Sequence, residues 1–198
     1  MTNEKKKLYL IRHAETIRNA HIQGLRNVGS SCRRFKLPVK EDFTLGGKGI
    51  WGFVSRDKDS ELSELGKLQV VKLSKLLSDQ KFLEKITKIG HSPLVRAEHT
   101  CDGILNGNKE VKKVKLDCLS EIAPGEYALK FNRPVRRRIC ELGEWLDAQD
   151  DEAIALVGHS EYFRLLLNMR EKFRNCDVWE VSYESDGVFS TPEMLYRI

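Results

Sequence analysis

The sequence lacks the cysteine patterns of secreted or metal-binding proteins. Only five of its 198 residues are cysteine, and no two of them show a C-x-x-C or other metal-ligand spacing. An odd number of scattered cysteines is typical of reduced thiols in a cytosolic protein rather than of a disulfide framework. We therefore expect a cytoplasmic protein that has neither structural disulfides nor a metal site.

Long hydrophobic runs are also missing. The N-terminal letters MTNEKKK are charged, and only four apolar residues follow before Arg12. That run is shorter than the apolar part of a signal peptide, and no stretch approaches the length needed to cross a bilayer. We expect no association with a membrane.

The excess of positive charge is small. The chain has 34 Lys and Arg residues against 29 Asp and Glu, which gives a formal net charge of +5. Such a surface favours anionic partners, but no run interleaves aromatic and basic residues as in single-strand binding proteins. Nucleic acid is therefore not an expected partner. With 40% hydrophobic residues, the chain can form one domain, residues 1–198, with its own core.

What is present is an alternation of strand and helix patterns. Short apolar runs rich in β-branched residues predict strands, and amphipathic stretches between them predict helices. This alternation indicates an α/β fold with a largely parallel sheet. The expected strands are 7–11, 85–90, 111–116, 153–158, 178–183 and a last one near 193–198, after the Asp186-Gly187 turn.

Four apolar stripes with helical spacing mark the predicted helices. The first follows Ser63, a candidate N-cap. We interpret all four as faces that pack in the core. Their members are Val70, Leu73 and Leu77; Ala97, Cys101, Ile104 and Leu105; Val135, Ile139, Leu142 and Leu146; and Tyr162, Leu165, Leu166 and Met169.

Residues 21–60 interrupt this alternation. They are rich in glycine, serine and charged residues, with scattered aromatics. Loops longer than about 12–15 residues without secondary structure are uncommon in compact domains and are often functional. We expect an insert in the domain, which is either a lid or substrate-facing element or a tolerated surface insertion.

Charged and imidazole side chains follow three of the predicted strands. Arg12-His13 follows the first strand, His159 follows 153–158, and Arg96 begins the helix after 85–90. Ligands of open α/β sheets bind outside the carboxyl ends of the strands, so these side chains are expected to converge. Arginine forks match phosphoryl oxygens, and a neutral imidazole can attack phosphorus. A carboxyl group whose pKa is raised by nearby phosphate can protonate the leaving alkoxide.

The sequence resembles the histidine phosphatase superfamily, the phosphoglycerate mutase-like proteins, in five segments that occur in the family's order. LIRHAETIRN resembles the pattern R-H-G/A-E-S/T-x-x-N at the end of the first strand. The other segments are DSELSELGKLQ (59–69), SPLVRAEHT (92–100), LSEIAPGE (119–126) and ALVGHSEYFRLLL (155–167). The resemblance implies a three-layer α/β/α sandwich around a mixed, mostly parallel central sheet.

The resemblance also implies an activity. A phosphatase of this family hydrolyses phosphomonoesters through a phosphohistidine intermediate, without a metal or other cofactor. The matching nucleophile is His13, and His159 matches the second imidazole, which stabilises charge. The implied catalytic residues are His13, Glu121 and His159, and the implied phosphate-binding residues are Arg12, Asn19 and Arg96.

Several alternatives stay open at this level. Asn19 also fits a helix cap or turn, and His91 is either a pocket residue or a buried structural one. The basic residues in the insert and at 130–138 form either a solvated surface or a region that attracts a substrate with several phosphates.

Two other functions share the same residues. A phosphoglycerate mutase uses the same phosphohistidine step, and a catalytically silent regulator keeps the same anion pocket. We favour a phosphatase because the chain is short beside the glycolytic mutases and shows no long C-terminal tail. The expected substrate is a phosphorylated small molecule, with phosphoproteins as further candidates. The sequence gives no indication of the oligomeric state.

Overall fold

The computed structural model describes residues 5–20, 59–122, 126 and 133–198. The chain divides into two compact units, one made of Met1–Ala14 with Gln69–Ile198 and one made of Glu15–Leu68. The insert expected at 21–60 lies almost wholly outside the described residues. Both the insert and the single-domain organisation therefore stay predictions.

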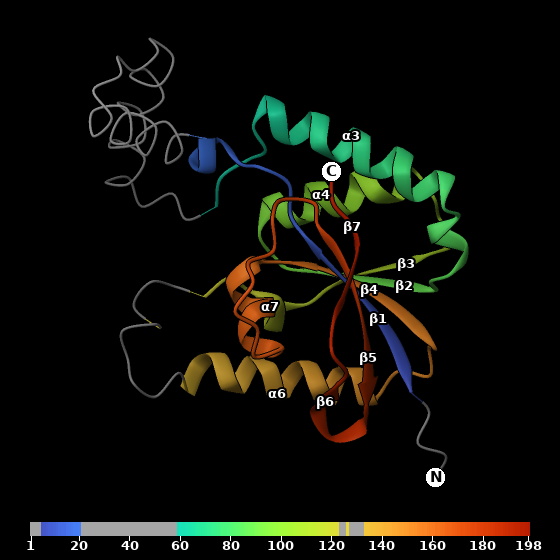
Figure 1. Cartoon of the computed structure of the whole chain (residues 1–198), viewed down its shortest axis with the longest axis vertical. Coiled ribbons are helices and arrows are strands. Elements are labelled where there is room, and N and C mark those ends of the chain that lie inside the picture. The colour runs from blue at the N-terminus through green and yellow to red at the C-terminus, as the bar shows by residue number, and fades with distance from the viewer. Residues whose placement is uncertain (1–4, 21–58, 123–125, 127–132) are drawn as a thin grey trace. The chain divides into compact units, whose positions relative to one another are not determined.

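A seven-stranded sheet forms the centre of the larger unit (Figure 1). Its order is β3-β2-β4-β1-β5-β6, and β7 also pairs with β5. The neighbours β3, β2, β4 and β1 run parallel, whereas β5 runs antiparallel to β1. The predicted strands are all present, with β2 and β3 shorter than expected. Their bounds are β1 Lys6–Arg12, β2 Lys88–His91, β3 Lys112–Lys115, β4 Ala153–Gly158, β5 Val178–Glu184, β6 Val188–Phe189 and β7 Glu193–Tyr196.

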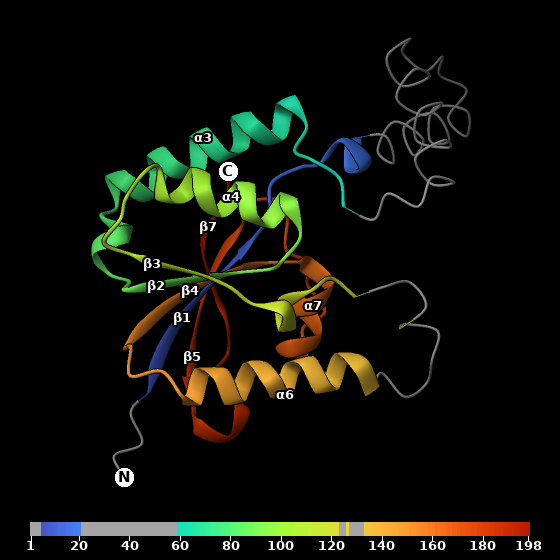
Figure 2. The same cartoon turned by 180° about the vertical axis from the view of Figure 1, so that it is seen from behind.

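Helices cover both faces of this sheet, as the two opposite views show (Figures 1 and 2). One face carries α4 (Val95–Leu105) and the part of α3 (Glu64–Asp79) that belongs to this unit. The other face carries α6 (Arg133–Asp147) and α7 (Ser160–Leu166). The predicted three-layer α/β/α sandwich is confirmed. Short 3-10 turns lie at η1 Phe82–Glu84, η2 Asp117–Leu119 and η3 Ser185–Gly187.

Three of the four predicted helix faces pack as expected, and the fourth is partly wrong. Leu165 is 37% exposed, whereas Met169 lies beyond the end of α7 but still packs against the core. The helix is short because Asn168 adopts a left-handed conformation with φ of 50°, which ends the helical turn. The buried face is formed instead by Tyr162 and Phe163. A Cβ on Gly158 would lie 2.8 Å from Cζ of Phe163, so glycine is needed where α7 packs on β4.

The smaller unit joins the segment after His13 to the start of α3. The hydroxyl of Ser63 accepts a hydrogen bond from the Gly66 amide at 3.0 Å and donates to Oε1 of Glu15 at 2.7 Å. Ser63 is thus the predicted N-cap. A Cβ on Gly66 would lie 2.0 Å from the carbonyl oxygen of Glu15, which leaves room only for glycine. These contacts give a physical reason for the residues of DSELSELG.

Two other expectations concern the chain as a whole. Within the described ranges, no helix combines the length and the apolar composition needed to cross a membrane. Four cysteines lie in these ranges, and all four carry free thiols: Cys101, Cys118, Cys140 and Cys176.

Candidate active site

The order of the strands brings the predicted residues to one edge of the sheet. β2, β4 and β1 are neighbours, with His91 opposite Val157 and Arg12 opposite Gly158. The pairing continues past the strand ends, because the His13 amide donates to the Gly158 carbonyl at 3.0 Å. His13 and His159 therefore leave the carboxyl ends of adjacent strands side by side.

His13 is held as a neutral ring with one free nitrogen. Its side chain is buried, and Nδ1 lies 2.7 Å from the carbonyl oxygen of Ala14. A carbonyl can only accept, so Nδ1 carries the hydrogen and Nε2 keeps its lone pair. Burial, followed by the charges of His159, Arg96 and Arg12, holds the pKa of His13 well below its usual value. At neutral pH the ring is therefore in the nucleophilic form.

His159 lies next to His13, with the ring centroids 5.2 Å apart. The ring is fully buried, and Nε2 lies 2.8 Å from the hydroxyl of Ser92. Nδ1 lies 3.1 Å from Oε2 of Glu121, although the angle is not that of a hydrogen bond. Burial lowers the pKa of His159 despite the opposing effect of Glu121.

Glu121 follows the 3-10 turn η2 and is the most exposed of the catalytic candidates. Its side chain is 31% exposed, and Oε2 lies 3.6 Å from Nη2 of Arg96. Burial raises the pKa of this carboxyl group, but the contacts with His159 and the charge of Arg96 lower it below its usual value overall. The group is thus ionised at neutral pH before a phosphate binds.

Two guanidinium groups border the histidines. Arg96 lies in the first turn of α4 and is 7% exposed. Arg12 ends β1 and donates through Nη1 to the Phe173 carbonyl at 2.7 Å. Burial lowers the pKa of Arg12, but a guanidinium group keeps its charge in proteins. The site therefore offers two fixed positive charges to an anion.

Several buried atoms at this edge have no hydrogen-bond partner within the described part of the chain. They are Nε of Arg12, Oε1 of Glu121, Nδ1 of His159 and Oγ of Ser160. Buried polar groups are normally paired, so unpaired ones need an explanation. A bound phosphoryl group fits, because its oxygens accept from the donors and a protonated carboxyl group can donate to it.

His13, Glu121 and His159 also place potential metal-ligand atoms within 4.8 Å of one another. Two imidazoles and one carboxylate are a donor set that zinc accepts. The neighbouring guanidinium groups of Arg12 and Arg96 repel a cation and attract an anion. We therefore interpret the cluster as an anion site.

The sixth predicted residue lies in the smaller unit. The amide of Asn19 donates to Oγ1 of Thr16 at 3.2 Å, so Thr16 caps the turn that contains Asn19. The relation of Asn19 to the other five residues is not determined, and its contact with phosphate stays a prediction. The structure assigns His91 to the core, where it is 2% exposed and Nδ1 donates to the Ser92 carbonyl at 2.8 Å.

One segment behind His13 was not predicted from the sequence. Residues Phe173–Asp177 surround the backbone of Arg12 and His13. Asn175 donates through Nδ2 to the His13 carbonyl at 2.9 Å, and the Arg12 amide donates to the Asp177 carbonyl at 3.2 Å. Most of these contacts use backbone atoms, which every residue type has, so the sequence shows no pattern that would predict them.

A second unpredicted residue, Thr100, had a sequence signal, since it closes the segment SPLVRAEHT. Its hydroxyl accepts from the Ala14 amide at 3.0 Å and donates to the Arg96 carbonyl at 2.7 Å. Thr100 thereby connects the loop after His13 to the helix that carries Arg96.

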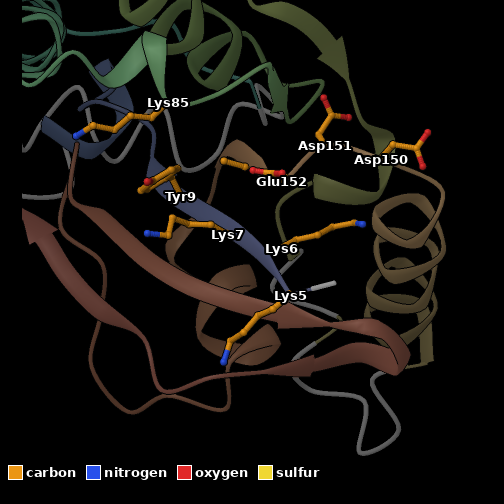
Figure 3. A pocket seen from close by; sticks show the side chains of 9 residues that line it. Lys5, Lys6, Lys7, Tyr9, Lys85, Asp150, Asp151 and Glu152 are labelled. Carbon is orange, nitrogen blue, oxygen red and sulfur yellow. The ribbon is translucent and has the colours of Figure 1, made fainter. Parts of the chain in front are cut away.

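A hollow of about 570 Å³ lies at the opposite ends of β1 and β4 (Figure 3). Lysines and carboxylates line it together, including Lys7, Lys85 and Asp151. Lys7 pairs with Glu180 at 2.9 Å, and Asp151 pairs with Lys88. Its charges largely neutralise one another, unlike those of the cationic site at the carboxyl edge.

The sequence profile of the histidine phosphatase superfamily (branch 1) matches residues 48–151, just over half of the chain. The chain therefore belongs to the histidine phosphatase superfamily. The matched part contains Arg96 and Glu121, whereas the segments around His13 and His159 lie outside it.

Solved structures share the fold over nearly the whole chain. An Escherichia coli K-12 protein thought to be an alpha-ribazole-5'-P phosphatase has a TM-score of 0.64 and 16% identity, with 97% of both chains covered. A phosphoglycerate mutase from Bacillus anthracis has a TM-score of 0.60 and 16% identity, covering 98% of this chain and 93% of its own. An Entamoeba histolytica phosphoserine phosphatase has a TM-score of 0.54 and 16% identity, covering 94% and 97%.

No curated protein sequence gives a significant match. The superfamily and the solved structures together indicate an enzyme of the phosphatase and mutase group, with the phosphoglycerate mutase-like fold expected from the sequence.

Proposed function

We propose that this protein is a phosphatase that hydrolyses phosphomonoesters through a phosphohistidine on His13. One observation carries this proposal. Nδ1 of buried His13 is bonded to the Ala14 carbonyl, which leaves a nucleophilic Nε2 in the same cluster as Arg12 and Arg96. A neutral nucleophile beside fixed positive charge suits attack on an anionic phosphoryl group.

In the first step Nε2 of His13 attacks phosphorus. The new P–N bond forms while the P–O bond to the substrate alcohol breaks. Arg12 and Arg96 balance the charge of the phosphoryl oxygens, and His159 donates to one of them through Nδ1. Glu121 gives its proton to the leaving alkoxide. Its pKa is low in the free protein, so the phosphate dianion must raise it on binding.

In the second step water attacks the phosphohistidine. The Glu121 carboxylate takes a proton from the water, the P–N bond breaks, and inorganic phosphate leaves with His13 neutral again. The 31% exposure of the Glu121 side chain supports this step, because part of that side chain lies in contact with solvent although Oε1 itself is buried. His13 and His159 are almost completely buried by comparison.

A phosphoglycerate mutase is the second candidate, since one of the similar structures has that name. Chain length does not separate the two activities, because that mutase and this chain cover each other almost completely. Phosphorylated glycerate distinguishes them. Isomerisation without release of phosphate would favour the mutase, and release of phosphate favours the phosphatase. Binding of phosphate without any turnover would favour a silent regulator.

The proposed substrate is a small phosphomonoester, with phosphoproteins as a further candidate. Two of the similar structures are named for alpha-ribazole-5'-P and phosphoserine, which are monoesters of quite different alcohols. We propose that the phosphoryl group is recognised by the described site. We also propose a cytoplasmic enzyme that needs no metal, nucleic acid or membrane.

The test is hydrolysis of an aryl phosphate with and without a metal chelator. The wild-type protein should release phosphate at the same rate in both conditions, and His13→Ala should reduce the rate to that of buffer. His99→Ala is a matched control, because His99 is an exposed histidine on α4. Turnover that persists in His13→Ala, or disappears with the chelator, would contradict the proposal.

A further inference from the structure

The two active-site imidazoles are held by different kinds of partner. Nδ1 of His13 faces the Ala14 carbonyl, which can only accept a hydrogen bond. Nε2 of His159 faces the Ser92 hydroxyl at 2.8 Å, and a hydroxyl can both donate and accept. The first partner fixes one tautomer, whereas the second can serve a neutral or a protonated ring.

The surroundings of His159 define its neutral form. Nδ1 lies 3.1 Å from the ionised carboxylate of Glu121, so the proton of the neutral ring is on Nδ1. Nε2 is then unprotonated, and the hydroxyl of Ser92 donates to it. If the ring gains a second proton, Nε2–H donates to Oγ of Ser92 once the hydroxyl hydrogen turns away.

Ser92 is fixed firmly enough to do this. Its side chain is fully buried, and its amide donates to the Val157 carbonyl at 3.0 Å. The Leu94 amide lies 3.4 Å from Oγ, and the His91 ring donates to the Ser92 carbonyl at 2.8 Å. The buried His91 thus has a structural role in holding Ser92. The freedom that remains is rotation of the hydroxyl hydrogen.

The charged groups around His159 favour a change of its protonation when phosphate binds. Glu121 favours the protonated ring, whereas Arg96 and Arg12 oppose it, and the neutral ring of His13 lies beside it. A phosphate dianion would add negative charge next to Nδ1 and shift this balance towards the protonated form. The Ser92 hydroxyl can pair with Nε2 in both the neutral and the protonated ring, and this property matters because both forms then occur during the reaction.

We propose that Ser92 is a positioning residue that keeps Nδ1 of His159 directed to the phosphate site in both protonation states of the ring. This role deepens the proposed phosphatase function and rests on it. With Ser92 in place, the ring can gain or lose one proton during the reaction without leaving Nε2 unpaired.

The kinetic test compares Ser92→Ala with Ser92→Thr, which keeps the hydroxyl. Loss of the hydroxyl costs the protonated ring more, because a charge-assisted hydrogen bond is the stronger one. The pKa of His159 should fall, so the alkaline limb of kcat should move to lower pH in Ser92→Ala. We expect kcat to drop about ten- to a hundredfold with little change in KM. Ser92→Thr should restore both properties.

Ser190→Ala is the matched control, since the Ser190 hydroxyl bonds the Ser182 amide in the antiparallel part of the sheet. It should behave as the wild type. A Ser92→Ala enzyme with a wild-type pH profile and kcat would overturn the proposal. If Ser92→Ala does not fold, Ser92→Cys provides a variant of similar size with a weak donor, and it should shift the profile in the same direction.

A measurement without turnover separates this proposal from the proposed function. In ¹⁵N-labelled protein, the ring nitrogens of His159, assigned with a His159→Gln variant, should show the Nδ1–H tautomer in the wild type and Ser92→Thr. Ser92→Ala should keep that tautomer, which Glu121 favours, but should protonate at lower pH, and an unchanged titration of the His159 ring would contradict the role of Ser92. If the wild-type protein gave these spectra but showed no phosphatase activity, the proposed function would be contradicted and the role of Ser92 would stand.

Discussion

Oε2 of Glu121 lies 3.1 Å from Nδ1 of His159, so the proposed acid and the second imidazole share one side of the site. This contact helps to hold the pKa of Glu121 below its usual value, against the effect of its burial. The same carboxyl group must be protonated when it acts as an acid. Binding of the phosphate dianion has to reverse the local balance of charge, which links substrate binding to the protonation of Glu121.

Glu121→Gln should separate substrates by the quality of their leaving groups. Glutamine cannot donate the proton that an alkoxide needs, whereas an aryl oxide leaves without it. We expect a loss of about 100- to 10,000-fold on alkyl phosphates and a much smaller loss of phosphorylation rate on aryl phosphate. The measurement is pre-steady-state release of the alcohol. Equal losses on both substrates would remove Glu121 from the acid role.

Arg96→Lys should weaken the binding of inorganic phosphate. Lysine keeps the charge but loses the planar fork that contacts two oxygens. We expect the inhibition constant of phosphate to rise about tenfold or more, the effect of one charge-assisted hydrogen bond. Arg137→Lys is the control, since Arg137 is exposed on α6 and pairs with Glu141. An unchanged inhibition constant for Arg96→Lys would place Arg96 outside the anion site.

Acid should destabilise the fold through its buried histidines. Burial lowers the pKa of His13, His91 and His159 in the folded protein, so below about pH 6.5 the unfolded chain binds more protons. Stability is therefore present above that pH and is lost as the pH falls through the folded pKa values. Each such histidine contributes up to about 1.4 kcal/mol per pH unit.

Urea unfolding at pH 7.5 and 5.5 measures this effect. His91→Gln should lose less stability between the two pH values than the wild type, because one of the three protonation sites is gone. His99→Gln should follow the wild type, since His99 is exposed. An identical pH dependence in His91→Gln would show that His91 does not stay neutral in the fold.

Arg197→Met should destabilise the segment behind the nucleophile. Arg197 donates to both oxygens of fully buried Asp177, at 3.0 and 2.8 Å. Removal of the guanidinium leaves a buried carboxylate with fewer partners, at a cost of about 1–3 kcal/mol. Activity should fall as well, because the Asp177 carbonyl holds the Arg12 amide.

Two further variants test the cause of that loss. Glu171→Gln removes an exposed partner of Arg197 at 3.3 Å and should cost less than about 1 kcal/mol. Asp177→Asn combined with Arg197→Met should recover part of the lost stability, since no uncompensated charge remains. A loss of stability in Glu171→Gln as large as that in Arg197→Met would show that the effect of Arg197 does not depend on the buried carboxylate of Asp177.

The fold follows from the sequence to the extent that local patterns determine it. The strands and the helices that cover them agree with the alternation of apolar runs, because each element has one consistent period. The prediction failed at α7, where Leu165 is exposed and Asn168 turns the chain out of the helix. The spacing of apolar residues does not indicate whether an asparagine adopts the left-handed conformation.

The convergence of four candidate residues at one edge of the sheet was predictable from the sequence. Arg12, His13 and His159 follow strand ends, and Arg96 begins a helix, so parallel order alone brings them to one edge. The partners behind them were not predictable. Ser92 lies in the segment SPLVRAEHT, but its residue type does not indicate a contact with His159, and the contacts of residues 173–177 run mainly through backbone atoms. The low pKa of Glu121 depends on the packed positions of His159 and Arg96.

The most direct test is to trap the phosphorylated enzyme. The wild-type protein is mixed with a ³²P-labelled monoester, denatured within milliseconds and digested. We expect label in the peptide that contains His13, stable to alkali and released by acid, and no label in His13→Ala. Label on another residue, or phosphate release with no labelled protein at any time, would contradict it.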